Sequence, residues 1–181
     1  MAKAVTEEKL ADRPLLVDLF GEFRFKVDAK GRMALPAKFR KVLPSELIVS
    51  RELQDECLYV FTPDTFNEWV EQLFIDRFGG YNASDRRHVL MRSKLKSRAD
   101  EVEIDSSGRI MLKPELREAC SIEREVVVVG NTGHFEIWDA STYDKTMDDI
   151  DLGAFYESDK KKDSDWKESA LADDLELRVA R

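Results

Sequence analysis

The first clear pattern in the chain is an alternation of apolar and polar residues from Glu22 to Val27. A period of two is typical of a strand with one buried face. Asp28-Ala29-Lys30-Gly31 follows and predicts a turn, because Asp accepts backbone N–H groups and Gly adopts positive φ without steric cost. Residues 32–35 resume the strand pattern, so this part of the chain predicts a β-hairpin.

A short helical turn, two strands and a longer helix are predicted next. Pro36 is expected to open the helical turn, because proline fits the first position of a helix. Asp64 is predicted to cap the longer helix. The expected elements are the helical turn at 36–43, strands at 48–49 and 57–61, and a helix that contains Phe66, Trp69, Val70 and Leu73.

The chain repeats itself at a distance of 77 residues. Val27–Leu35 falls on Ile104–Leu112, and both segments contain Asp-x-x-Gly-Arg. Without a gap, the same offset aligns Phe39-Arg40 with Leu116-Arg117, Leu58–Phe61 with Phe135–Trp138, and Thr65-Phe66 with Thr142-Tyr143. One offset that aligns a turn, a strand and a helix start indicates two tandem copies of one unit. The second copy is expected to repeat the elements of the first, with Ser141 as its helix cap.

Five segments describe the predicted organisation. A flexible extension, a first unit, a helical connector, a second unit and an acidic tail are expected over residues 1–20, 21–66, 67–99, 100–144 and 145–181. Within the connector, Ser84–Leu95 is predicted to be a helix with Asp85 near its start. After about Leu152 the apolar pattern gives way to the charged run Glu157–Asp163, which predicts a mobile tail with a possible helix around Trp166–Leu177.

The composition is that of a soluble globular protein. Of 181 residues, 43% are hydrophobic and 36% are charged, and the net charge is −8. Nowhere does an apolar run approach the roughly 18 residues of a membrane span, and the N-terminus lacks the basic start of a secretory signal. Cys57 and Cys120 are isolated, which argues against a disulfide framework or a zinc site. We therefore expect a cytoplasmic protein with no membrane partner.

The charge is unevenly distributed along the chain. The segment 24–51 has a net charge of +6, the segment 86–98 contains six basic residues and no acidic one, and the segment 144–181 has a net charge of −5. Two basic stretches in an acidic chain fit a surface that binds a polyanion, and they also fit two solvated faces.

Catalytic and cofactor motifs are absent from the sequence. It contains no G-x-S-x-G, P-loop, H-E-x-x-H or dinucleotide fingerprint. His88 and His134 are the only histidines, and neither lies in a nucleophile motif. We expect no enzyme activity, no cofactor, no metal and no small-molecule substrate.

The repeated Asp-x-x-Gly-Arg turn is the main candidate site. In one interpretation it is purely structural: Asp28 and Asp105 close the turns, Gly31 and Gly108 supply the bends, and each Arg pairs with its Asp. In the other, the arginines contact DNA, because a β-ribbon fits the major groove and Arg makes paired hydrogen bonds to guanine or phosphate. The candidate DNA-binding residues are Arg32, Arg109, Lys30, Arg24 and Lys26. The first unit is expected to contribute more, because Lys30 is replaced by Ser107 in the second.

The residues from Gly21-Glu22 to Arg40, with the pattern G-E-x4-V-D-A-K-G-R-x3-P-A-K-F-R, resemble the first half of the MraZ proteins. Glu101–Arg109, Glu125–Gly130 and Phe135–Trp138 resemble the second half, so the resemblance extends over about residues 21–149. It implies a mainly β fold with short helices (α+β), in which two SpoVT-AbrB-like swapped-hairpin units form a pseudo-dimer barrel within one chain.

The resemblance also implies a function. MraZ proteins are ring-shaped homo-oligomers that regulate transcription from tandem direct repeats upstream of the division and cell-wall gene cluster, usually including their own gene. The family's D-x-x-x-R signature falls on Asp28 with Arg32 and on Asp105 with Arg109, and it implies DNA contact by both arginines in a nucleoid-associated protein without a cofactor. The competing hypothesis is an oligomeric protein-docking module that has only non-specific affinity for DNA.

Overall fold

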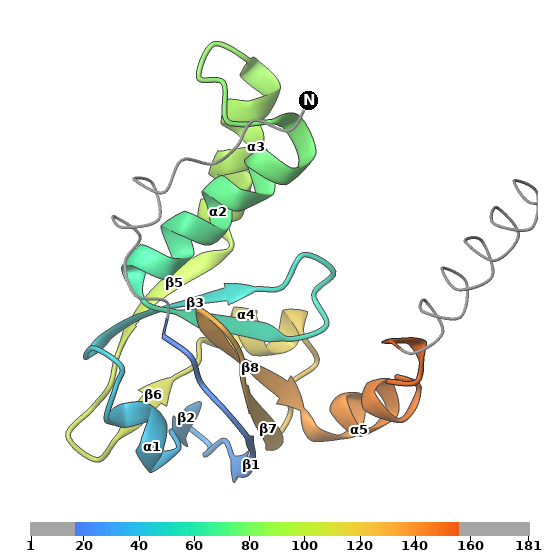
Figure 1. The fold of residues 1–181 in the computed structure, drawn as a ribbon. Helices are drawn as coiled ribbons and strands as arrows, with labels where there is room; N and C mark the ends of the chain where they lie inside the picture. The colour runs from blue at the N-terminus through green and yellow to red at the C-terminus, as the bar shows by residue number, and fades with distance from the viewer. Residues whose placement is uncertain (1–16, 156–181) are drawn as a thin grey trace, which may run out of the picture. The chain divides into compact units, whose positions relative to one another are not determined.

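The computed structural model describes residues 17–155 and shows a β structure with short helices (Figure 1). The strands are β1 Glu22–Lys26, β2 Arg32–Ala34, β3 Glu46–Arg51, β4 Leu58–Phe61, β5 Ala99–Glu103, β6 Arg109–Met111, β7 Glu125–Gly130 and β8 His134–Asp139. The helices are α1 Ala37–Arg40, α2 Pro63–Phe78, α3 Arg86–Ser97, α4 Pro114–Ala119 and α5 Ala140–Asp148.

The strands exchange partners between the two repeats. The six-stranded sheet has the order β1-β7-β8-β4-β3-β5, and β2 pairs with β6 in a separate two-stranded sheet. The first strand of each unit therefore joins the β-hairpin of the other unit, as in a swapped-hairpin fold. The two sheets surround one core, and the ladders of the described residues do not join them into one continuous barrel.

The simple hairpin predicted for the segment 22–35 is wrong. The turn is present, because the Gly31 amide donates to the Asp28 carbonyl at 2.9 Å. Beyond the turn, however, β1 pairs with β7 and β2 pairs with β6. The exchange lets the buried residues of both units contribute to a single core, which is larger than either unit could form alone.

The 77-residue repeat is confirmed for the strands around the turns. β1 and β5 are related by this offset, and β2 and β6 begin at equivalent residues. The offset rises to 79 between β3 and β7, which begin at Glu46 and Glu125, and the hairpin register returns it to 77 at β4 and β8. The ungapped alignment therefore has a compensated two-residue shift at β7, where surface loops absorb the difference.

The shared core is rich in aromatic and aliphatic side chains from both units. Phe39 of α1 lies 5.5 Å, between ring centroids, from both Phe23 of β1 and Phe135 of β8. Met33 and Ile110 are each 1% exposed and contribute the inner face of the two-stranded sheet. The core thus fixes the position of β2 and β6 relative to the larger sheet.

α2 and α3 form a helical arm that extends away from the sheets (Figure 1). Thr62, and not Asp64, caps α2: its side chain accepts from the Thr65 amide, and the Thr65 side chain accepts from the Thr62 amide. A threonine at the third helical position thus completes a capping box, which the sequence analysis did not consider. Asp85 caps α3 by accepting from the Arg87 amide at 2.8 Å, so the predicted connecting helix is confirmed.

At the start of α5, the cap also lies two positions before the predicted residue. Asp139 Oδ1 accepts from the Ser141 amide at 3.1 Å and from the Thr142 amide at 3.3 Å. Asp139 rather than Ser141 is therefore the capping side chain, which fits the strong preference for Asp at this position. Apart from the two repeats, the contacts within the chain divide it into two compact parts, with the boundary between Tyr143 and Asp144.

Residues 17–20, which the sequence analysis placed in a flexible extension, contact the second repeat. Leu19 is 4% exposed, its amide donates to the Asn131 carbonyl at 3.2 Å, and Asp18 forms a β-bridge with Thr132. Residues 17–20 thus pack against the β7–β8 turn, whereas the rest of the extension and the possible helix at 166–177 lie outside the described residues. Between residues 17 and 155, no helix is long and apolar enough to cross a membrane.

Candidate nucleic-acid interface

The carboxylate of Asp28 organises the first turn. Its Oδ1 atom accepts from the amides of Lys30 and Arg32, each at 2.9 Å, and its Oδ2 atom accepts from Arg32 Nε at 2.8 Å. These bonds hold the Arg32 side chain by one edge of its guanidinium group. The Nη1 and Nη2 groups of Arg32 have no partner among residues 17–155, so they remain available to a ligand.

The second turn has nearly the same geometry. Asp105 Oδ1 accepts from the amides of Ser107 and Arg109 at 2.9 Å, and Oδ2 accepts from Arg109 Nε at 3.0 Å. Arg109 Nη2 also lies 3.0 Å from Oδ2, so Asp105 engages more of its arginine than Asp28 does. The predicted pairing of each Arg with its own Asp is confirmed at both turns.

These contacts favour the ionised form of both carboxyl groups. The Arg32 backbone N–H is the main cause that lowers the pKa of Asp28, and the Arg32 side chain and Lys30 amide lower it further. The Arg109 backbone N–H and side chain lower the pKa of Asp105 in the same way. Both turns are therefore built around a permanent negative charge at neutral pH.

Gly31 and Gly108 place each turn against the opposite unit. Gly31 has φ +83°, and a Cβ atom there would lie 2.6 Å from the carbonyl oxygen of Leu112. The Leu112 amide donates to the Gly31 carbonyl at 2.8 Å, and the Leu35 amide donates to the Gly108 carbonyl at 3.0 Å. Gly31 is therefore required by close approach to backbone as well as by φ, whereas at Gly108 the near atoms belong to the Arg40 side chain. The structural interpretation of the turn predicted only the φ requirement.

The structure brings the two repeated arginines onto one surface. In the β2–β6 ladder, Arg32 pairs with Met111 and Arg109 pairs with Ala34. Side chains alternate along a strand, and the central pair of this ladder is buried, so both arginines lie on its outer face. Their side chains are 32% and 35% exposed. We call this outer face of β2 and β6 the ribbon face.

The remaining predicted DNA-binding residues are distributed unequally. Lys30 is exposed at the tip of the first turn, next to the ribbon face. Arg24 and Lys26 lie on β1 in the larger sheet, where Arg24 Nη2 is 3.4 Å from Glu22 and Lys26 Nζ is 3.3 Å from Glu125. The structure therefore does not bring these two residues onto the ribbon face, and each has a carboxylate neighbour.

The equivalent strand of the second unit carries the opposite charge. Glu101 and Glu103 of β5 occupy the positions that Arg24 and Lys26 occupy on β1. Together with the replacement of Lys30 by Ser107, this makes the surroundings of the first turn more basic than those of the second.

Two further arginines border the turns and were missed as candidate site residues. Arg40 of α1 lies against Gly108, and its side chain would collide with a Cβ atom there. Arg117 of α4 lies against Gly31 and donates from Nε to the Leu112 carbonyl at 3.2 Å. The 77-residue alignment already paired Arg40 with Arg117, and this repetition was the available signal. Each turn is thus completed by an arginine of the other unit.

Metal-binding and thiol chemistry find little support here. Among residues 17–155, no group of three or more His, Cys, Asp or Glu side chains could hold a metal ion. Cys57 and Cys120 are buried free thiols, and burial raises the pKa of Cys120 to about 11. A thiol that is protonated and buried is a poor nucleophile.

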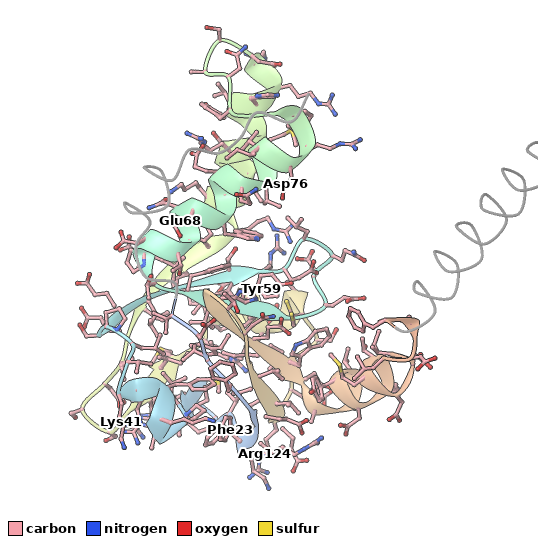
Figure 2. The ribbon with its side chains drawn as sticks, viewed as in Figure 1. Phe23, Lys41, Tyr59, Glu68, Asp76 and Arg124 are labelled. Carbon is pink, nitrogen blue, oxygen red and sulfur yellow. The ribbon has the colours of Figure 1, made fainter. Side chains whose placement is uncertain are left out.

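In Figure 2, the side chains around β2 and β6 and the side chains of the helical arm lie at opposite ends of the part of the chain that ends at Tyr143. Lys41, which follows α1, is labelled at the first, and Asp76 is labelled on α2 toward the second, with Glu68 nearer the sheets. The described basic groups of the two turns therefore belong to a surface that is remote from α2.

Comparison with known proteins identifies the family. The family model described as MraZ protein matches residues 19–87 and 95–164. A Treponema denticola protein named transcriptional regulator MraZ is 32% identical over 70% of this chain and 85% of its own length. Proteins of the same name from Coxiella burnetii and Ralstonia pickettii are 35% and 37% identical over 68% of this chain, and the alignments include 80% and 83% of those proteins. With two matched repeats and relatives aligned over most of their length, the chain belongs to the MraZ family.

Proposed function

We propose that this protein is a sequence-specific DNA-binding transcriptional regulator that contacts DNA with its ribbon face. The observation that carries the proposal is the position of Arg32 and Arg109 on one exposed face of the β2–β6 ladder. The name transcriptional regulator MraZ, which the relatives carry, supports the same function. A two-stranded ribbon is narrow enough to enter the major groove.

The turn geometry prepares the arginines for this contact. Asp28 binds Arg32 through Nε, and no residue within 17–155 bonds the two Nη groups, so both can donate to DNA. A guanidinium group presented in this way can donate two hydrogen bonds to guanine O6 and N7 or to a phosphate. Asp28, Gly31, Asp105 and Gly108 act as positioning residues in this proposal.

The first unit is proposed to bind DNA more strongly than the second. Lys30 can contact phosphate from the tip of the first turn, and Ser107 brings no charge to the second. Arg24 and Lys26 can add phosphate contacts if they exchange their carboxylate partners for DNA. Arg40 extends the basic surface at the second turn, since no carboxylate within residues 17–155 pairs with its guanidinium group.

We further propose that a ring-shaped homo-oligomer binds tandem direct repeats. One ribbon face covers only a few base pairs, so a single copy offers limited specificity. When several copies are linked, each later contact becomes intramolecular, and weak contacts combine when repeat spacing matches copy spacing. The proposed targets lie upstream of the division and cell-wall gene cluster, including this protein's own gene, which places the protein in the cytoplasm at the nucleoid.

Fluorescence anisotropy tests the proposed function. The full chain is titrated against duplex DNA from immediately upstream of its own gene and against a shuffled duplex of equal length, in about 0.15 M salt, where weak electrostatic binding is suppressed. A preference of about tenfold or more for the natural duplex is expected. Equal weak binding to both would contradict the proposal and favour the protein-docking module.

A further inference from the structure

The helical arm carries an apolar groove that the proposed DNA contact does not use. The groove has a volume of about 340 Å³ and lies between α2, α3 and the β3–β4 loop. Its apolar walls come from Leu53, Leu73, Phe74, Phe78, Met91 and Leu95. Leu53 is 50% exposed and Met91 is 37% exposed, so the walls are open to a ligand.

Basic side chains border this groove. Residues 77–98 contain seven Lys and Arg residues and a single acid, Asp85. Arg92 pairs with Glu71, and Arg98 pairs with Asp55 at 2.6 Å. Arg77, Lys94 and Arg98 line the groove, and no carboxylate within residues 17–155 pairs with Arg77 or Lys94. An apolar groove with unpaired cations at its edge suits an acidic peptide that also carries large apolar side chains.

One segment of this chain has that chemistry. Residues 163–177 contain six acids and one base, and the same segment contains Trp166, Leu171, Leu175 and Leu177. We propose that the groove of one copy binds the segment 163–177 of a second copy. Arg77 and Lys94 then neutralise carboxylates of the segment, while its apolar side chains cover the walls of the groove.

The exposed apolar surface of the arm favours a second copy as the source. Ile75 is 51% exposed and Leu90 is 54% exposed, and neither lines the groove. Ile75 lies in a different hollow, with Thr132 and His134, whereas Leu90 lies beside Met91 and Lys94 of the groove. A neighbouring copy seated on the groove can therefore cover Leu90 as well. Direct contact between the α3 helices of two copies is disfavoured, because Arg86–Ser97 contains five basic residues and no acidic one.

This contact is heterologous, since the groove and the segment are different surfaces. Heterologous contacts repeat from copy to copy and form a ring when the rotation closes. The groove and the segment together therefore supply a contact surface for the proposed oligomer, and this contact does not depend on DNA binding.

Photo-crosslinking of mixed full-length chains tests the proposal. A ¹⁵N-labelled chain carries p-benzoyl-phenylalanine in place of Met91 together with Leu171→Asp and Leu175→Asp, which damage its own segment and leave its groove available. An unlabelled chain carries Lys94→Glu and Arg77→Glu, which damage its groove and leave its segment available. Mass spectrometry then identifies crosslinked peptides, and circular dichroism checks that each variant is folded.

The expected result is a crosslink between the groove of the labelled chain and the segment 163–177 of the unlabelled chain. This crosslink should be lost at about 1 M salt, because the Debye length is then near 3 Å and the charge attraction is screened. The labelled chain alone should give no such crosslink. A labelled chain with the probe in place of Met91 and no other change should also crosslink to unlabelled wild-type segments. Lys41→Glu in the labelled chain, which makes the same charge change at the opposite end, should leave the yield unchanged.

Three results would overturn the proposal. The first concerns the mixture of the wild-type chain with the labelled chain whose only change is the probe, in which both chains offer an intact segment to the groove. A crosslink that joins the probe only to the segment of its own chain would overturn the proposal. The second is a crosslink from residue 91 to the arm of another copy or to any other segment. The third is the absence of any crosslink from residue 91 to the segment 163–177 in folded protein. A probe in place of the exposed Val42 measures the background of non-specific crosslinking.

Discussion

Met33 and Ile110 lie opposite each other in the β2–β6 ladder, and they occupy equivalent positions of the two repeats. A residue that pairs with its own equivalent marks a pseudo-twofold axis through the ladder. Arg32 and Arg109 are exchanged by this axis, so the ribbon face presents the same side chain twice in related positions. The symmetry includes the aspartates and glycines of the turns, but the charges around the two turns differ.

Arg32→Ala and Arg109→Ala are expected to weaken binding to the natural upstream duplex. If each arginine contacts a base, its loss should cost about 1–3 kcal/mol for each engaged turn. The effect should be larger for Arg32, because Arg109 is bound more completely by its own aspartate. Anisotropy titrations of both variants measure the difference, with Arg86→Ala on the arm as the control. Unchanged affinity of a folded Arg32→Ala protein would show that Arg32 is structural.

A reciprocal exchange at the turn tips tests the predicted inequality of the units. Lys30→Ser should lower the affinity for DNA of any sequence, and Ser107→Lys should raise it, because each changes one phosphate contact. The slope of log K against log salt should change by about one for each substitution. If Ser107→Lys leaves both affinity and slope unchanged, the second turn does not approach the phosphates.

Sequence reasoning predicted the turns well and the strand partners less well. Asp28, Gly31 and Arg32 act within five residues, so turn chemistry alone indicates their contacts. The pairing of β1 with β7 joins residues about a hundred positions apart, and from the residues alone the nearer strand β2 was the simpler partner. Only the resemblance to MraZ implied the exchange.

The missed features share a physical cause. Thr62 and Asp139 each cap their helix two residues before the predicted cap, because nearby polar residues compete for the same role. Arg40 and Arg117 act across the interface between units, where sequence distance gives no indication of contact. The same holds for the apolar groove, whose walls come from three separate segments.

Gly31→Ala should destabilise the fold more than Gly79→Ala. Both glycines have positive φ, +83° and +77°, so the cost of the left-handed backbone is similar in the two variants. A Cβ atom at Gly31 would meet the Leu112 carbonyl oxygen at 2.6 Å, whereas nothing lies within 4 Å of one at Gly79. Urea unfolding measures the difference, which reports the close approach between the units. Equal losses of stability would mean that the turn moves to accommodate the methyl group.

The carboxyl groups of Asp28 and Asp105 should titrate below the ordinary value of about 3.9. A lowered pKa in the folded state stabilises the fold above the unfolded pKa, and this contribution is lost as pH falls through the folded pKa. The turns should therefore stay intact at pH 5 and loosen only in stronger acid. The side-chain carboxyl ¹³C shifts of the folded protein report both titrations directly.

Arg32→Ala separates the causes of the Asp28 shift. The substitution removes the Nε donor but keeps the Arg32 backbone N–H, which is the largest cause, so the pKa of Asp28 should rise and still remain below the ordinary value. Arg109→Ala should leave Asp28 unchanged and raise Asp105 instead. A return of Asp28 to the ordinary value in Arg32→Ala would show that the arginine side chain, rather than the backbone of the turn, maintains the charge that positions it.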